Sequence, residues 1–86
     1  MKTYYFVLVL TDDDRICLPQ KSRKEAIRTI DSLLHRMETN AITIQLLRNT
    51  VAWTYNGSEI LLEWDRAHTE SNWTQRLGAC PFGGAE

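Results

Sequence analysis

The sequence predicts an α+β domain, in which one long helix packs on one face of an antiparallel sheet of about five strands. Three observations predict this class: an N-terminal run of aromatic and β-branched residues, one amphipathic segment with helical spacing, and an Asn-Gly pair between alternating apolar residues. The expected order is ββαβββ followed by a short C-terminal helix. The chain has 86 residues, so 1–86 is expected to be a single domain.

The N-terminal segment 3–11 is predicted to be a strand, because strands favour its aromatic and β-branched residues. Apolar side chains fall on both of its alternating faces, with Tyr5, Val7 and Val9 on one of them. A strand that is apolar on both faces is expected inside a sheet, with a cover on each side.

A return strand over residues 15–18 is predicted to pair with this segment. The three aspartates at 12–14 favour a tight turn, because Asp side chains bond to nearby backbone groups. Pro19 would end the return strand, since proline has no N–H to donate to a sheet. The chain is therefore expected to begin with a β-hairpin.

A helix is predicted to begin at Arg23, because Ser22 and Glu25 have the S-x-x-E spacing of a capping box. Asn40 can adopt the left-handed conformation that ends a helix, so a helix of about 17 residues is expected. Apolar side chains recur along it at three- and four-residue steps and form one stripe: Ala26, Ile27, Ile30, Leu33, Leu34 and Met37.

Asn56-Gly57 is a strong signal for a two-residue hairpin turn. This turn would pair a strand at 50–55 with a strand at 58–64, and the alternating segment 41–47 would add a third strand beside them. Trp53 would then lie in the centre of a three-stranded apolar face. The core is therefore expected to depend on this tryptophan.

The C-terminal part is predicted to contain a short helix over residues 69–78. Thr69 or Ser71 would serve as its N-cap, and Gly78 would lie just past its end. Residues 79–86 are rich in turn-forming residues and are expected to be an irregular tail.

One face of the N-terminal strand has no cover in this arrangement. Either the C-terminal segment lies over Tyr5, Val7 and Val9, or this patch meets another chain. The C-terminal segment has few apolar side chains, which favours a homodimer with two-fold symmetry.

The sequence carries no catalytic or metal-binding motif that we identify. Cys17 and Cys80 lack the spacing of a zinc site or a disulfide framework. His35 and His68 have no third ligand at a typical spacing. We therefore expect no cofactor, no metal and no catalytic residue, and interpret the chain as a protein that is not an enzyme. A small enzyme or an enzyme subunit remains an alternative.

Cations gather where the helix is predicted to start, although the start of a helix normally attracts acids. Only one acid, Glu25, lies among them. The strip is either an ordinary solvated face or a site for an anion, such as a phosphate or a carboxylate of a partner. Its members are Arg15, Lys21, Arg23, Lys24 and Arg28.

These features favour a small non-enzymatic protein-binding module, an inhibitor or regulator that occupies a surface of a larger protein or nucleoprotein complex. The net charge of −1 disfavours direct nucleic-acid binding through the strip, which remains an alternative. In size and character the chain is similar to small proteins of phages and mobile elements, including anti-CRISPR proteins, although no motif supports this analogy. The expected partner-binding residues are Arg15, Lys21, Arg23, Lys24, Arg28, Tyr5, Val7 and Val9.

The cysteine content indicates the cellular compartment in which the protein is expected. Two cysteines without a disulfide framework are typical of a reduced, cytoplasmic protein. The N-terminal apolar run lacks the length of a membrane span and the cleavage site of a signal peptide. No membrane partner is therefore expected.

Overall fold

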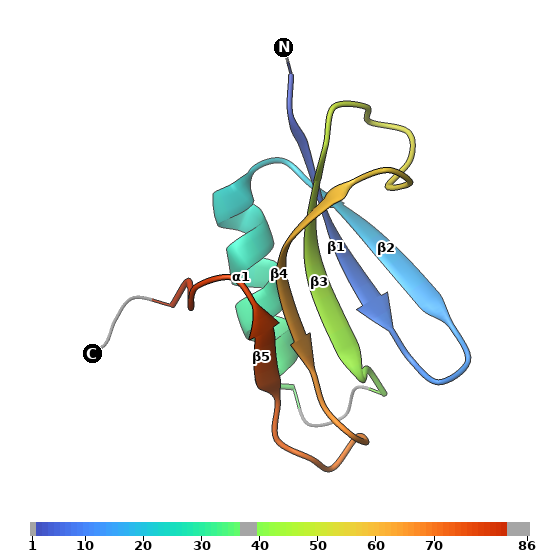
Figure 1. Ribbon diagram of the computed structural model, residues 1–86, viewed down its shortest axis with the longest axis vertical. Coiled ribbons are helices and arrows are strands. Elements are labelled where there is room, and N and C mark those ends of the chain that lie inside the picture. Colours follow the sequence, from blue (N-terminus) through green and yellow to red (C-terminus); the bar gives the residue numbers. More distant parts are fainter. Residues whose placement is uncertain (1, 37–39, 83–86) are drawn as a thin grey trace.

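A computed structural model describes residues 2–36 and 40–82. The strands form one antiparallel sheet in the spatial order β2-β1-β3-β4-β5. The expected class, an antiparallel five-stranded sheet with one helix, is confirmed for these residues. The elements are β1 (Tyr4–Leu10), β2 (Arg15–Gln20), α1 (Arg23–Leu34), β3 (Thr43–Asn49), β4 (Glu59–Asp65) and β5 (Thr74–Leu77) (Figure 1).

β1 lies inside the sheet, between β2 and β3 (Figure 1). Its side chains alternate between two apolar clusters, with Val7 and Val9 in one and Phe6 and Leu8 in the other. All four side chains are buried. The expectation of an interior strand with two covered faces is therefore confirmed.

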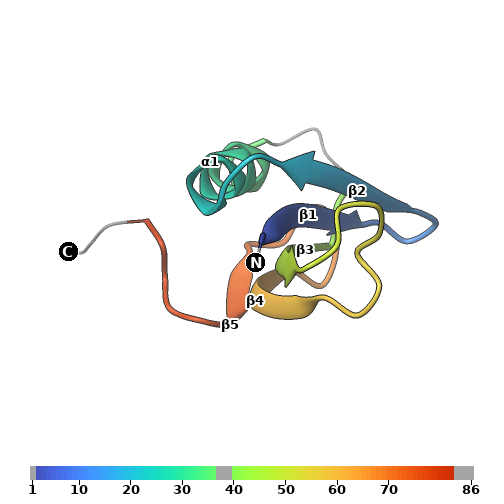
Figure 2. The same ribbon diagram turned by 90° about the horizontal axis from the view of Figure 1, so that it is seen from above.

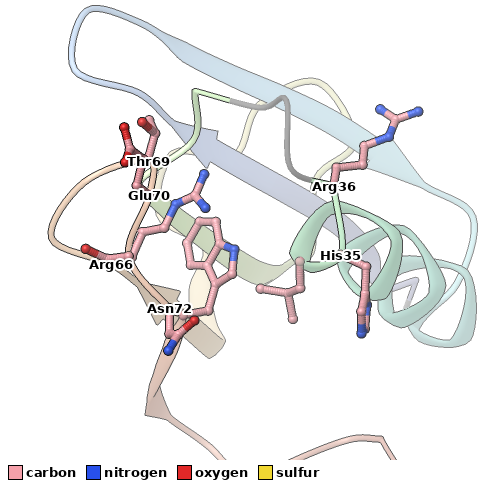
Figure 3. Close-up of a pocket in the computed structure, with 9 residues that line it drawn as sticks. His35, Arg36, Arg66, Thr69, Glu70 and Asn72 are labelled. Carbon is pink, nitrogen blue, oxygen red and sulfur yellow. The ribbon is translucent and has the colours of Figure 1, made fainter.

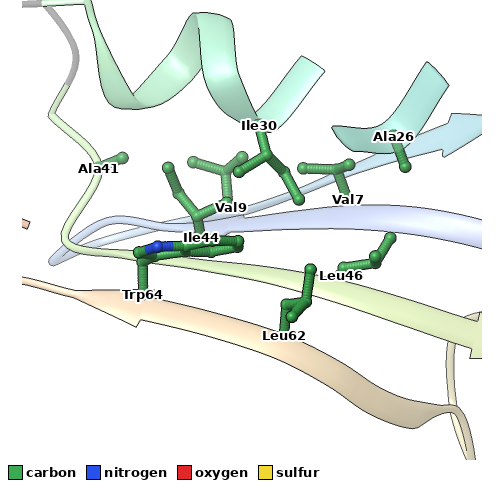
Figure 4. Packing of buried hydrophobic residues seen from close by; sticks show 9 residues of the cluster. All are labelled: Val7, Val9, Ala26, Ile30, Ala41, Ile44, Leu46, Leu62 and Trp64. Atoms are coloured by element: carbon green, nitrogen blue, oxygen red, sulfur yellow. The ribbon is translucent and has the colours of Figure 1, made fainter. Parts of the chain in front are cut away.

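The helix covers one of these two faces (Figure 2). It contacts β1, β2 and β3, and it buries Ala26 and Ile30 completely against the sheet. Removing this much apolar surface from water supplies the main stabilisation of the fold. The cluster beneath the helix consists of Val7, Val9, Ala26, Ile30, Ala41, Ile44, Leu46, Leu62 and Trp64 (Figure 4).

The patch of Tyr5, Val7 and Val9 is the face that the helix covers. Val7 is 0% exposed and Val9 6% exposed. The expectation that this patch is uncovered and meets another chain is therefore wrong. Because both faces of β1 are apolar, the alternation of residues along the strand does not show which face the helix covers.

The helix begins at Arg23 as expected but ends at Leu34, before the expected end at Asn40. The N–H of His35 donates to the carbonyl of Ser32 (3.3 Å), three residues back, which tightens the last turn. Residues 37–39, which the expected helix included, lie outside the described residues.

β3 pairs directly with β4, so that Leu46 lies opposite Leu62. The expected strand at 50–55 is wrong, and residues 50–58 form the loop that joins β3 to β4. Direct pairing is favoured because it places the apolar side chains of both strands beneath the helix at once.

The loop 50–58 folds over the other face of the sheet. Tyr55 packs against the cluster of Phe6, Leu8 and Leu47, and its hydroxyl accepts a hydrogen bond from Nη1 of Arg15 (3.1 Å). This loop therefore provides part of the second cover that β1 requires.

The amide of Asn49 holds the loop in shape. Its Nδ2 donates to the carbonyls of Thr54 (3.0 Å) and Asn56 (3.1 Å). A turn near the end of the loop is closed by a bond from the N–H of Ser58 to the carbonyl of Tyr55 (3.1 Å). The Asn-Gly signal thus marks a real turn, but one within a loop.

Trp53 lies in this loop and is 83% exposed, so its expected place in the core is wrong. Trp64 on β4 occupies the core instead, with 4% of its surface exposed. Phe82 stacks against Trp64 with 5.9 Å between the ring centroids.

The expected helix over 69–78 is also wrong, because Thr74–Leu77 form strand β5 and pair with β4. Pairing satisfies backbone groups along an edge of β4 that would otherwise face water. Residues 79–82 contain no helix or strand, as expected of the tail, and 83–86 lie outside the described part of the chain.

The two tryptophans provide a test of this register. Truncating buried Trp64 to alanine should lower the free energy of unfolding by about 3–5 kcal/mol, because it leaves a cavity in the core. Trp53→Ala should change it by only about 0.5 kcal/mol, as is usual for exposed sites. Chemical denaturation measures both values, and similar losses for the two variants would contradict the register.

The two glycines with a left-handed backbone provide a second test. Gly57 has φ +79°, and a Cβ added there would meet open space, whereas a Cβ at Gly78 (φ +83°) would lie 2.6 Å from the carbonyl oxygen of Leu61 and also overlap Leu62 Cδ2. Alanine at either site adds about 1–2 kcal/mol of backbone strain. Gly78→Ala should therefore lower the denaturation midpoint clearly more than Gly57→Ala. Equal midpoints would show that β5 does not approach β4 as described.

Candidate functional site

The start of α1 is fixed by the predicted capping box. Ser22 Oγ accepts a hydrogen bond from the N–H of Glu25 (3.1 Å), and Glu25 Oε1 accepts one from the N–H of Lys21 (3.2 Å). The reciprocal bond thus reaches one residue further back than in the usual pattern. These bonds determine how the first turn presents its side chains.

Four cations surround this start, and we call them the helix-start cluster: Lys21, Arg23, Lys24 and Arg28. All four residues are exposed. Lys24 and Arg28 are one turn apart, with roughly 5–6 Å expected between their Cβ atoms. Within residues 2–36 and 40–82, none of the four side chains forms a hydrogen bond or an ion pair. The cluster therefore presents concentrated positive charge to solvent.

Arg15 does not belong to this cluster. It lies at the opposite end of β2 from Lys21, about 20 Å away for an extended strand. Its hydrogen bond to the hydroxyl of Tyr55 raises the pKa of Arg15. The structure thus brings four of the five predicted cations together. The fifth, Arg15, instead bonds to the loop 50–58 through Tyr55.

α1, whose start carries the cluster, and the loop 50–58 lie on opposite faces of the sheet, and the chain enters both from the same end of the sheet (Figures 1 and 2). β2 ends with Gln20 opposite Tyr5, and β3 ends with Asn49 opposite Tyr4. The chain then enters the helix on one face and the loop on the other. The cluster and the loop 50–58 are therefore two separate surfaces of the molecule.

A cleft of about 620 Å³ opens between the end of α1 and the segment 66–73 (Figure 3). The guanidinium of Arg66 lies 4.3 Å from the centre of the Trp73 ring, and its Nε donates to the carbonyl of Ala41 (2.8 Å). His35 lines the cleft on the helix side. Sequence reasoning missed the stacked pair, because it placed Trp73 on a helix.

The histidines and cysteines do not assemble into a catalytic group. His35 lies past the end of α1, whereas Cys17 packs on the opposite face of the sheet. Burial raises the pKa of the Cys17 thiol, which opposes formation of the reactive thiolate. Cys80 is exposed, and His68 contacts Ser71 Oγ at 3.2 Å from its Nε2.

The aspartates 12–14 form the hairpin turn as expected. The hydroxyl of Thr11 accepts a hydrogen bond from the N–H of Asp14 (2.9 Å), and Asp14 Oδ1 accepts one from the N–H of Arg15 (2.8 Å). Among the described residues, no three His, Cys, Asp or Glu side chains are placed to hold a metal ion. The helix that the structure describes is not long and apolar enough to cross a membrane.

The helix-start cluster is the predicted site that the structure brings together most clearly. Tyr5, Val7 and Val9 lie beneath the helix instead, with Val7 and Val9 buried and Tyr5 half-buried. No family model, curated protein or solved structure matches this chain.

Proposed function

We propose that this protein is a small non-enzymatic protein-binding module, an inhibitor or regulator that occupies an acidic surface of a larger protein or nucleoprotein complex. The observation that carries the proposal is the helix-start cluster, which presents four exposed cations without partners in the described chain. Carboxylates of a partner would form charge-assisted hydrogen bonds with these side chains.

The fold presents the cluster rigidly. The opposite side of the helix is anchored by Ala26 and Ile30, both 0% exposed, and the capping box fixes the first turn. A surface that is already ordered loses less conformational entropy when it binds. The backbone of the cluster is therefore prepared for binding before a partner arrives.

The cluster also carries a cost that a partner would relieve. Cations at a helix start oppose the positive end of the helix dipole, and Lys24 and Arg28 repel each other at i, i+4 spacing. The carboxylate of Glu25 is the nearest acid in sequence, and it is occupied by the capping box. Acidic groups of a partner would reduce both repulsions.

A protein partner fits better than a nucleic acid. Nonspecific binding to phosphates depends on many cations, and its affinity falls steeply with salt. This chain has a net charge of −1, and its cations beyond the cluster are dispersed. A protein partner requires only a few well-placed charge pairs.

Charge reversal tests the proposal. The variant Arg23→Glu/Lys24→Glu should capture about tenfold less partner from a nuclease-treated native lysate, because acids replace half of the cluster. It should melt at or above the wild-type temperature, since acids suit the start of a helix.

The matched control is Lys2→Glu/Arg36→Glu, which lowers the net charge equally, from −1 to −5, without altering the cluster. This control should capture the partner like the wild type. Equal capture by both variants would overturn the proposal. A wild-type gel shift of an oligonucleotide that the cluster variant loses would favour the nucleic-acid alternative instead.

A further inference from the structure

We propose that the face of the sheet opposite α1 binds a second copy of this chain, with Trp53 of each copy seated in an open slot of the other. This inference concerns a surface separate from the helix-start cluster. It rests on three features of that face: its exposed apolar side chains, a slot beside them, and charged groups that already have hydrogen-bond partners.

The face opposite α1 exposes large apolar side chains. Ile60 lies opposite Leu47, and Leu77 lies opposite Glu63, which places both on this face. Ile60 is 41% exposed and Leu77 is 45% exposed. Trp53, in the loop that folds over this face, is 83% exposed. Exposed apolar side chains on one face of a sheet favour a protein interface there.

An open slot of about 210 Å³ lies on the same face, between the sheet and the loop. Its apolar lining comes from Leu8, Leu47, Ile60 and the ring of Tyr55, and polar groups of Gln45, Asn56 and Ser58 complete it. A protein cavity of about 150 Å³ is known to hold a benzene ring. The slot is therefore large enough for an aromatic ring.

The exposed tryptophan and the slot would make this face complementary to itself. In a two-fold dimer the same surface of each copy must supply both halves of the contact. Trp53 and the residues 55–58 of the slot belong to one loop, so each loop would both insert a side chain and receive one. A second copy is therefore the occupant that this face fits.

Each charged side chain of this face that the structure describes already has a hydrogen-bond partner within one copy. Arg15 bonds to Tyr55, and Glu63 Oε1 accepts from Gln45 Nε2 at 2.7 Å. Asp65 on β4 is paired with Arg76 at 2.8 Å. The loop 50–58 contains no charged residue. Covering the face would therefore leave its charged groups with hydrogen-bond partners, and Asp65 and Arg76 with each other.

The broad faces of the molecule can accommodate the contact of a stable dimer. Its dimensions are 40 × 36 × 18 Å, so one broad face has room for the roughly 800 Å² that each partner buries in a standard interface. A dimer through this face leaves both helix-start clusters on its outer sides. It would therefore bind a repeated acidic surface with two sites.

Sedimentation velocity of the purified chain tests the inference. From low to high micromolar concentration the wild type should reach twice its monomer mass of 10.0 kDa. Trp53→Ala and Ile60→Arg should remain monomeric at concentrations where the wild type is a dimer. Both sites are exposed, so both variants should fold, as a thermal melt would verify.

Ile16→Ala is the matched control, because Ile16 is 45% exposed but pairs with Val9 on the helix side of the sheet. It should dimerise like the wild type, and so should Arg23→Glu/Lys24→Glu. A monomeric wild type, or a dimer that survives both Trp53→Ala and Ile60→Arg, would overturn the inference. Loss of dimer in Ile16→Ala alone would place the interface on the other face and overturn it as well.

Discussion

The structure depends on one constraint, which is that β1 is apolar on both faces. A strand of this kind must be flanked on both edges and covered on both sides. β2 and β3 pair with the two edges of β1. On one side α1 covers Val7 and Val9, and on the other the loop 50–58 places Tyr55 over Phe6 and Leu8. The rest of the sheet extends from this centre through β4 and β5.

Short sequence motifs were sufficient to predict the elements that depend on interactions between neighbouring residues. The first hairpin, the capping box of Ser22 and the helix stripe all follow from short-range chemistry, and the structure contains each of them. The expected end of the return strand at Pro19 is wrong, because β2 continues through Pro19 to Gln20 at the edge of the sheet, where a proline is tolerated. Even the Asn-Gly turn is present, with Gly57 at φ +79°. These features depend on neighbouring residues and are therefore visible in the sequence.

Long-range choices could not be predicted in the same way. Trp53 and Trp64 both lie in segments with alternating apolar residues, and only the pairing of β3 with β4 decides that Trp64 is buried. The pairing of β5 and the Arg66–Trp73 contact depend on the same kind of choice. For the candidate site, the capping box predicted where the helix begins, and this placed Lys21, Arg23, Lys24 and Arg28 around its start. The separate role of Arg15 required knowledge of where the loop lies.

The second cover of β1 is the central claim, because it explains the long β3–β4 loop and locates the face that we propose for dimerisation. Leu8 tests this cover most directly, because its side chain lies on that side of β1 and is 6% exposed. The free energy of unfolding of Leu8→Ala, measured by chemical denaturation, should be about 2–5 kcal/mol below that of the wild type, as for a buried leucine. A change within about 0.5 kcal/mol, as at an exposed site, would show that this face of β1 is not covered.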